Sequence, residues 1–160
     1  MTRLRATLLA LATLLAMPAP FAVAQDAAIA NMEILRQKVK ADKKVVVAAN
    51  LALTDAEARK FWPVYDGYQA ELEKINRRLG TLIADYAAAY NAGPVSNATA
   101  KKLINESVAI EAAELKLKRD TMPKLEQALP GAKAARYMQI ENKIRAAIRY
   151  ELASGIPLTN

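Results

Sequence analysis

The stretch LTDAEARKFWPVYDGYQAEL, residues 53–72, decides the fold because it contains both the start of a helix and the beginning of its apolar face. Thr54 can accept a hydrogen bond from the Glu57 amide, and the Glu57 carboxylate can reach back to the Thr54 amide, which is the capping box of a helix N-terminus. Apolar residues then follow at alternating spacings of four and three, which predicts one long helix with a continuous apolar seam. The seam consists of Phe61, Tyr65, Tyr68, Leu72, Ile75, Leu79, Leu82 and Tyr86.

The whole chain has the composition of an all-α protein. Glycine is scarce, with five residues in 160, alanine is abundant, and runs of β-branched residues are rare. We expect four helices, over residues 27–49, 55–91, 97–128 and 131–153. Ser96 is the predicted N-cap of the third helix, and Gly155 is the predicted left-handed residue that stops the fourth.

Two prolines lie deep inside predicted helices. Pro63 and Pro123 each remove one helical hydrogen bond and crowd the carbonyl four residues earlier. The apolar spacing continues across both positions, so each proline should bend its helix rather than end it. The sequence therefore predicts a bowed helical hairpin.

The third and fourth predicted helices have their own apolar patterns. In the third helix two stripes start one residue apart, about 100° around the helix, which predicts contacts with two neighbours. These stripes are Leu103, Ile110 and Leu117, and Ile104, Val108, Leu115 and Met122. The residues of the fourth helix that we expect to be buried are Tyr137, Ile140, Ile144, Ile148 and Leu152.

The N-terminal residues have the pattern of a secretory signal peptide. Arg3 and Arg5 precede the apolar run 8–17, and Ala22-Val23-Ala24 follows as a cleavage site. Because this run is too short to span a bilayer comfortably, a retained anchor is the less favoured interpretation. We expect residues 1–24 to be removed, leaving a single all-helical domain over residues 25–160 without a transmembrane segment. An exported protein is not expected to meet nucleic acid.

Aligning residue 53 with residue 129 places LTDAEARKF over LPGAKAARY, and the stretch ARYMQIENKIRAAIRYELASGIPL follows. With these stretches the chain resembles the Spy/CpxP-like periplasmic family, the LTxxQ-motif superfamily, and in particular its uncharacterised proteobacterial members. Glu57 and Lys133 stand where the family has glutamine, and Pro130 stands where it has the second threonine. The positions that carry the resemblance are Leu53, Thr54, Glu57, Leu129, Pro130 and Lys133.

The resemblance implies a four-helix, cradle-shaped antiparallel homodimer in the periplasm. Members of the family act as ATP-independent chaperones, as envelope-stress sensors or adaptors, or in metal resistance. The absence of histidine and cysteine removes the usual general bases, nucleophiles and transition-metal ligands, so we expect neither an enzyme nor a metal site or cofactor. Glu111 and Glu114 could share a helix face, but carboxylates that alternate with lysine and arginine are typical of solvated surfaces.

Positive charge is concentrated in the first and fourth predicted helices. The chain has a net charge of +7, or +5 once the two arginines of the signal peptide are removed. These basic residues either keep the protein soluble or form a rim around a concave, partly apolar surface that captures acidic unfolded chains. On the second interpretation the client-binding residues are Met32, Arg36, Lys40, Lys43, Lys44, Trp62, Arg136, Lys143, Arg145 and Arg149.

The aromatic set Phe61, Trp62, Tyr65 and Tyr68 is expected to belong to the core rather than to a ligand-binding box, with Trp62 lying off the seam. Our leading hypothesis is a periplasmic, ATP-independent chaperone-like protein that shields unfolded envelope proteins. One alternative is a sensor or adaptor that binds the periplasmic domain of a signalling receptor. Another is a structural envelope protein that recognises anionic lipid headgroups or cell-wall polymer.

Overall fold

The computed structural model describes residues 43–159. The predicted signal peptide, residues 1–24, and most of the first predicted helix lie outside the described residues. The chain divides into two units, Met1–Lys43 and Lys44–Asn160. The three labelled helices described below belong to the second unit.

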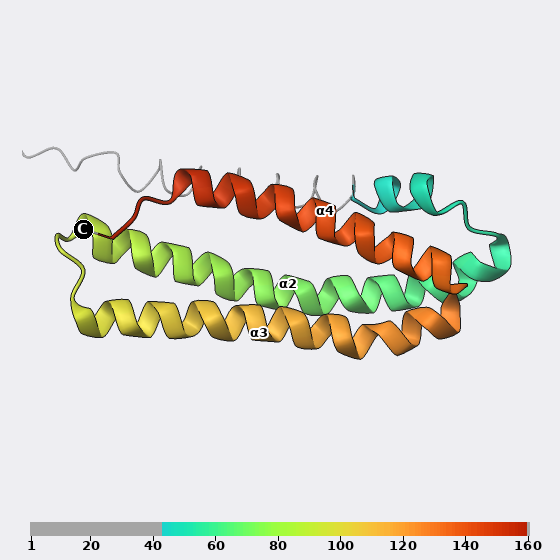
Figure 1. Ribbon diagram of the computed structural model, residues 1–160, viewed down its shortest axis with the longest axis horizontal. Helices are drawn as coiled ribbons and strands as arrows, with labels where there is room; N and C mark the ends of the chain where they lie inside the picture. Colours follow the sequence, from blue (N-terminus) through green and yellow to red (C-terminus); the bar gives the residue numbers. More distant parts are fainter. Residues whose placement is uncertain (1–42, 160) are drawn as a thin grey trace, which may run out of the picture. The chain divides into compact units, whose positions relative to one another are not determined.

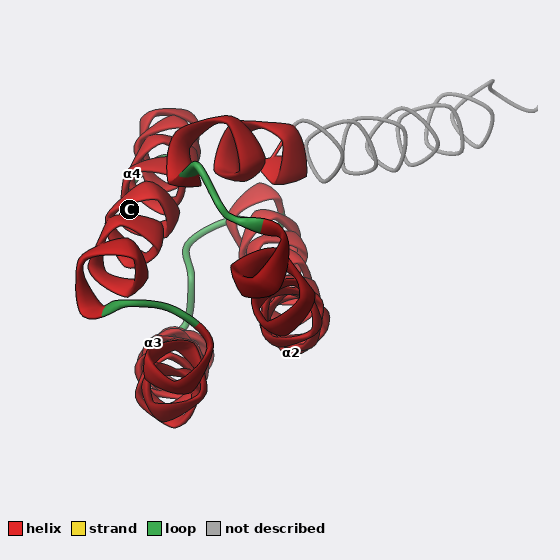
Figure 2. Ribbon diagram, turned by 90° about the vertical axis from the view of Figure 1, so that its right-hand side faces the viewer, coloured by secondary structure: helices red, strands yellow, loops and turns green. Residues whose placement is uncertain are grey.

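The described residues form helices and no strand, which confirms the all-α prediction. Residues 43–51 are helical and are followed by α2 (Asp55–Asn91), α3 (Asn97–Ala128) and α4 (Gly131–Gly155). Helices α2 and α3 run antiparallel along most of their length, and α4 runs back beside them at an angle (Figures 1 and 2). Within residues 43–159, no helix combines the length and the hydrophobicity that a membrane crossing requires.

The capping residues predicted from the sequence begin α2 and α3. The Glu57 amide donates to the Thr54 hydroxyl at 3.3 Å, and the Thr54 amide donates to the Glu57 carboxylate at 2.7 Å, so the capping box is complete. The Ser96 hydroxyl accepts from the Thr99 amide at 3.2 Å at the start of α3. At the start of α4, Pro130 occupies the N-cap position, where its missing N–H costs nothing.

Both interior prolines are accommodated without ending a helix. Helix α2 continues past Pro63 and α3 continues past Pro123, as their apolar spacing predicts. The turn between α2 and α3 contains Gly93 with φ 128°, a conformation that favours glycine. The prediction for Gly155 is wrong, because this glycine is the last residue of α4 and lacks a positive φ.

The apolar seam of α2 forms one side of the core. Its first five members are buried, whereas Leu79, Leu82 and Tyr86 are half-buried. All four helical segments contribute to the same buried cluster, which explains why a short chain without disulfides can close its interior. The cluster contains Val47, Leu51, Phe61, Tyr65, Tyr68, Leu72, Leu125, Ala128, Leu129, Ala134 and Tyr137.

The apolar faces of α3 and α4 differ from the prediction. Ile110 of the first α3 stripe is buried, but Ile104, Val108 and Leu115 of the second remain 60%, 58% and 50% exposed. We call these three exposed residues the α3 stripe. In α4 the buried residues are Ala134, Tyr137, Glu141 and Arg145, so the inward face is partly charged.

Ile148 is consequently 42% exposed, and its predicted burial is wrong. Ile140, Ile144 and Leu152 are only half-buried. The reason is that Glu141 and Arg145 find partners on α2 and α3 and therefore point inward, which turns the isoleucines towards the edge of the interface. Hydrophobic spacing alone cannot reveal such partners.

Ala52 generates the first stability prediction, because it adopts a φ of 44° immediately after the helical residues 43–51. This left-handed conformation costs a residue with a Cβ atom about 1 kcal/mol, and glycine adopts it without that cost. We expect Ala52→Gly to raise the free energy of unfolding by up to about 1 kcal/mol and Ala52→Val to lower it, as measured by urea denaturation. If Ala52→Val raised the free energy of unfolding, this would contradict the left-handed conformation of Ala52.

Candidate functional site

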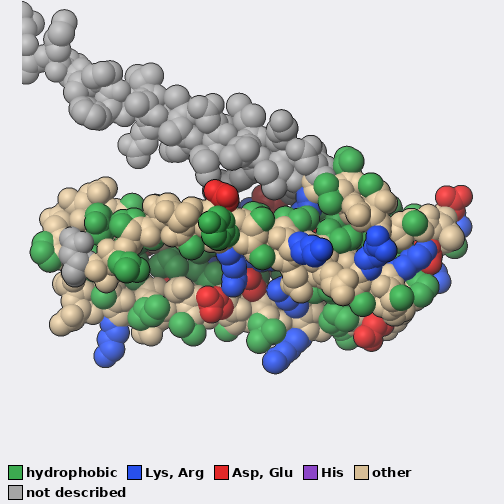
Figure 3. Space-filling view, turned by 45° about the horizontal axis from the view of Figure 1, so that its top comes forward, with side chains coloured by type: hydrophobic (Ala, Val, Ile, Leu, Met, Phe, Trp, Pro, Cys, Tyr) green, Lys and Arg blue, Asp and Glu red, His purple; other side chains and the backbone are tan. Residues whose placement is uncertain are grey.

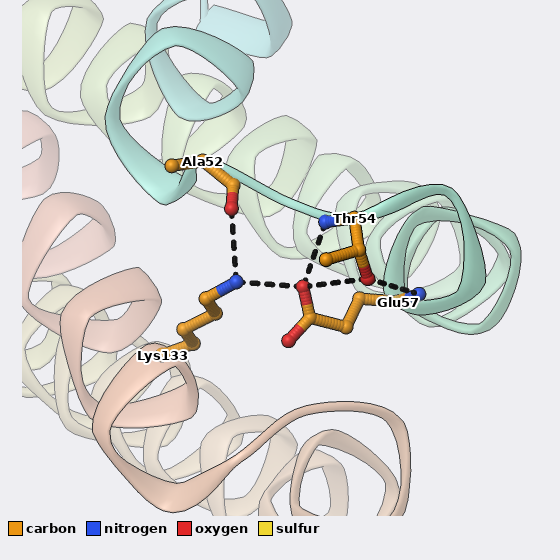
Figure 4. Close-up of polar contacts among 4 residues, drawn as sticks. All are labelled: Ala52, Thr54, Glu57 and Lys133. Carbon is orange, nitrogen blue, oxygen red and sulfur yellow. Dashed lines mark hydrogen bonds and ion pairs between the residues drawn. The ribbon is translucent and has the colours of Figure 1, made fainter.

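The two stretches that carry the family resemblance meet in the folded chain. Lys133, in the first turn of α4, donates to the Glu57 carboxylate at 2.6 Å and to the carbonyl of Ala52 at 2.9 Å (Figure 4). The Glu57 carboxylate therefore caps the start of α2 and holds the start of α4 at the same time. We call Ala52, Thr54, Glu57 and Lys133 the helix-start junction.

The apolar members of the same two stretches lie beside this junction. Leu129 is buried in the core cluster, and Leu53 is partly buried against it. The two positions that hold glutamine in the family thus hold opposite charges that contact each other here. Lys133 lowers the pKa of the Glu57 carboxyl by hydrogen bonding, and the Thr54 amide lowers it further.

An aromatic cluster lies next to this junction and confirms that Phe61, Tyr65 and Tyr68 belong to the core. The ring of Tyr137 from α4 contacts all three, with centroid distances of 5.1 to 6.3 Å. Burial raises the pKa of Tyr68 to about 12 and raises the pKa values of Tyr65 and Tyr137, and the nearby charge of Glu141 acts in the same direction. These phenols therefore stay neutral at physiological pH.

Two predicted client-binding residues, Lys44 and Trp62, are in contact with each other at the edge of this cluster. Trp62 packs on Phe61 and Tyr65 with centroid distances of 5.0 and 5.3 Å. The Lys44 ammonium lies 4.9 Å from the centre of the Trp62 ring and forms an ion pair of 2.9 Å with Asp66. This arrangement fastens the helical residues before Ala52 to α2 through a cation–π contact and an ion pair.

Beyond the aromatic cluster, α4 contacts the α2/α3 hairpin through polar side chains. The Gln69 amide of α2 donates to the fully buried Glu141 carboxylate at 2.8 Å. One turn further along α4, the Arg145 guanidinium donates to the Asn76 side chain at 3.3 Å. Beyond the end of α4, the Tyr86 hydroxyl donates to the carbonyl of Pro157 at 2.9 Å.

Glu114 of α3 is the centre of this polar interface. It is 5% exposed and forms ion pairs with Arg145 and, at 2.8 Å, with Arg149. Arg145 is itself 7% exposed, and desolvation lowers its pKa. Since a buried carboxylate without a cation is strongly disfavoured, the two arginines and Glu114 determine where α4 lies along α3.

The predicted basic rim is therefore altered at several positions. Arg145 is not exposed, contrary to its place in the predicted client-binding set, because Glu114 holds it inside. Arg149 is half-exposed and also bound to Glu114, whereas Arg136 and Lys143 are exposed on α4. Lys43 is the first described residue, and Met32, Arg36 and Lys40 lie outside the described residues.

The surface feature that the sequence did not predict is the α3 stripe. Lys101, Lys118 and Arg119 are three or four residues from its members and share or flank its side of the helix. Figure 3 shows one face of the molecule, on which hydrophobic side chains are exposed next to lysine and arginine. A helical wheel could not have distinguished this stripe from a buried one, because exposure depends on where α4 packs.

The carboxylates of the described chain do not gather into a group that could hold a metal ion. Glu111 remains exposed while Glu114 is buried against arginine, so the two do not act as a carboxylate pair. No family model, curated protein or solved structure matches the chain. The resemblance to the Spy/CpxP-like family therefore stays a prediction that rests on the motif residues.

The helix-start junction gives a pH-dependent stability prediction. Because the pKa of Glu57 is lower in the folded chain than its ordinary value of 4.5, its ion pair stabilises the fold above that pH. The stabilisation is lost as the pH falls through the lowered value. Lys133→Met should lower the Tm at neutral pH, and the difference from wild type should shrink below pH 4.5. A Tm difference that is constant with pH would contradict this; Lys143→Met, on the exposed side of α4, is the control.

The buried ion pair gives a second stability prediction. Glu114→Leu leaves the buried Arg145 without its carboxylate and should lower the free energy of unfolding by about 3–5 kcal/mol. Arg145→Leu should cost less, because Glu114 keeps its ion pair with Arg149. The double variant should be more stable than Glu114→Leu, because the buried guanidinium is removed together with its carboxylate. Urea denaturation of the wild type, the two single variants and the double variant gives the four free energies of this double-mutant cycle. The exposed substitution Glu111→Leu is the control and should change the free energy of unfolding by less than about 0.5 kcal/mol. Additive losses in the double variant would rule out the pairing.

Proposed function

We propose that this chain is a periplasmic, ATP-independent chaperone-like protein that binds unfolded or stressed envelope proteins. The supporting observation is the α3 stripe, three large apolar side chains exposed on one face of a helix whose opposite face is already packed. Single exposed apolar residues are common on protein surfaces, but a group of them on one face is typical of a surface that binds other chains.

Charge around the α3 stripe favours clients with exposed acidic segments. Lys101, Lys118 and Arg119 lie beside the stripe, and Glu111 is the acidic residue within it. Long-range attraction would speed the first encounter, and apolar contacts would then hold the client loosely. Binding of this kind needs no reaction, in agreement with the absence of histidine and cysteine from the sequence.

The proposal includes export by the predicted signal peptide and assembly into a homodimer, as the family resemblance implies. Light scattering on the purified chain without residues 1–24 should give twice the mass of one chain. The α3 stripe is assigned to clients in this proposal and not to the contact between the two copies. The oligomeric state of stripe variants therefore tests the assignment directly.

The function prediction uses the triple variant Ile104→Ser, Val108→Ser and Leu115→Ser. Burying each of these side chains against a client contributes on the order of 1–2 kcal/mol, so the variant should bind clients at least about tenfold more weakly. The measurement is suppression of aggregation of several unrelated denatured proteins at near-stoichiometric ratios, with and without high salt, which should slow capture. A control triple variant replaces other exposed apolar residues with serine: Val45, Val46 and Tyr150.

Three outcomes would contradict the proposal. Wild-type protein that protects no denatured protein but binds one receptor domain tightly would indicate the sensor or adaptor instead. A stripe variant that becomes monomeric would place the α3 stripe in the dimer contact, and clients would then have to bind elsewhere. Binding only to lipid vesicles or cell-wall fragments would indicate the structural role.

A further inference from the structure

A groove runs between α2 and α3 on a side to which α4 contributes no residue. Its apolar lining comes from both helices: Pro63, Val64, Tyr68 and Ile75 of α2, and Ala113 and Leu117 of α3. We call it the α2/α3 groove. From Pro63 to Arg78 it extends over about 22 Å, at 1.5 Å per helical residue.

Gly67 lines the α2/α3 groove in the interior of a 37-residue helix. Glycine in a helix interior is destabilising relative to alanine, so a packing reason is normally expected for it. The described chain provides no such packing reason. A Cβ atom added to Gly67 would meet no other atom within 4 Å, leaving aside the neighbouring residues and the backbone of its own helix. A side chain at position 67 would instead project into the groove and fill it.

The charged residues around the groove favour an acidic occupant. Four of them are basic, namely Lys74, Arg78, Lys116 and Lys124, and two are acidic, Glu71 and Asp120. The two acidic residues form ion pairs within their own helices, Glu71 with Lys74 and Asp120 with Lys116. Arg78 also contacts Glu106 at 3.0 Å, where the next stretch of the groove begins. The residues that line the α2/α3 groove from Pro63 to Arg78 therefore include two more basic than acidic side chains.

We infer that the α2/α3 groove binds one amphipathic helical segment of a client, with acidic residues beside its apolar face. Two adjacent helices form ridges between which a third helix packs its side chains, and anchors at i, i+3 or i+4, and i+7 would reach the apolar lining. The length of the groove corresponds to a segment of about 15 residues. This inference rests on the proposed function and adds the kind of segment that is recognised and a second surface that recognises it.

The experiment uses a fluorescent synthetic peptide of about 15 residues, with leucine anchors at heptad spacing and glutamate beside them. Wild-type protein should bind it, and a version with lysine in place of glutamate should bind at least about tenfold more weakly. Gly67→Leu should weaken binding of the acidic peptide at least about tenfold while leaving the Tm unchanged or raising it, because leucine is the better helix former. Ala84→Leu, exposed on the same helix and outside the groove lining, is the matched control and should bind like wild type.

Unchanged peptide binding by Gly67→Leu, or no binding by wild type, would overturn the inference. The result is separable from that for the proposed function. If wild type suppresses aggregation but does not bind the peptide, only the groove inference fails. If the peptide binds through the groove but no denatured protein is protected, only the proposed function fails.

Discussion

The packing of Phe61 against Tyr137 is the contact on which the rest of the described structure depends. Both rings are fully buried, and their centroids are 5.1 Å apart in an edge-to-face arrangement, which adds to the stabilisation from burial alone. Val47 and Leu51 from the preceding helix and Leu125 from α3 belong to the same cluster. Since the sequence contains no cysteine, this contact between distant segments has no disulfide to replace it.

On either side of this aromatic centre the chain uses charges to set the position of α4. At one end Lys133 binds the carboxylate that caps α2, so α4 begins where α2 begins. Further along, Glu114 pairs with Arg145 in the interior. Such buried pairs add little net stability compared with apolar contacts, but they make a displaced α4 costly, because any slip separates the charges. Specific alignment rather than additional stability is the physical effect of this polar interface.

The position of α4 in turn decides which surfaces remain available for binding. Its partly charged inner face covers Glu114 but leaves the α3 stripe in solvent, and it contributes nothing to the lining of the α2/α3 groove. The α3 stripe and the α2/α3 groove are thus both left accessible by the position in which α4 packs. Both combine apolar side chains with neighbouring lysine and arginine, which is suited to loose capture of chains with exposed apolar and acidic segments.

The sequence by itself determined the helices, their starts and the seam of α2, because caps, breaks and apolar periodicity are properties of neighbouring residues. Thr54 with Glu57, Ser96, and the glycine and proline after Asn91 could all be recognised from local spacing. Only the tertiary structure decided that Arg145 is buried, that Ile148 is exposed and that Glu57 meets Lys133. Each of these depends on a partner 31 to 76 positions away or on the place where α4 packs, and periodicity within one helix does not contain that information.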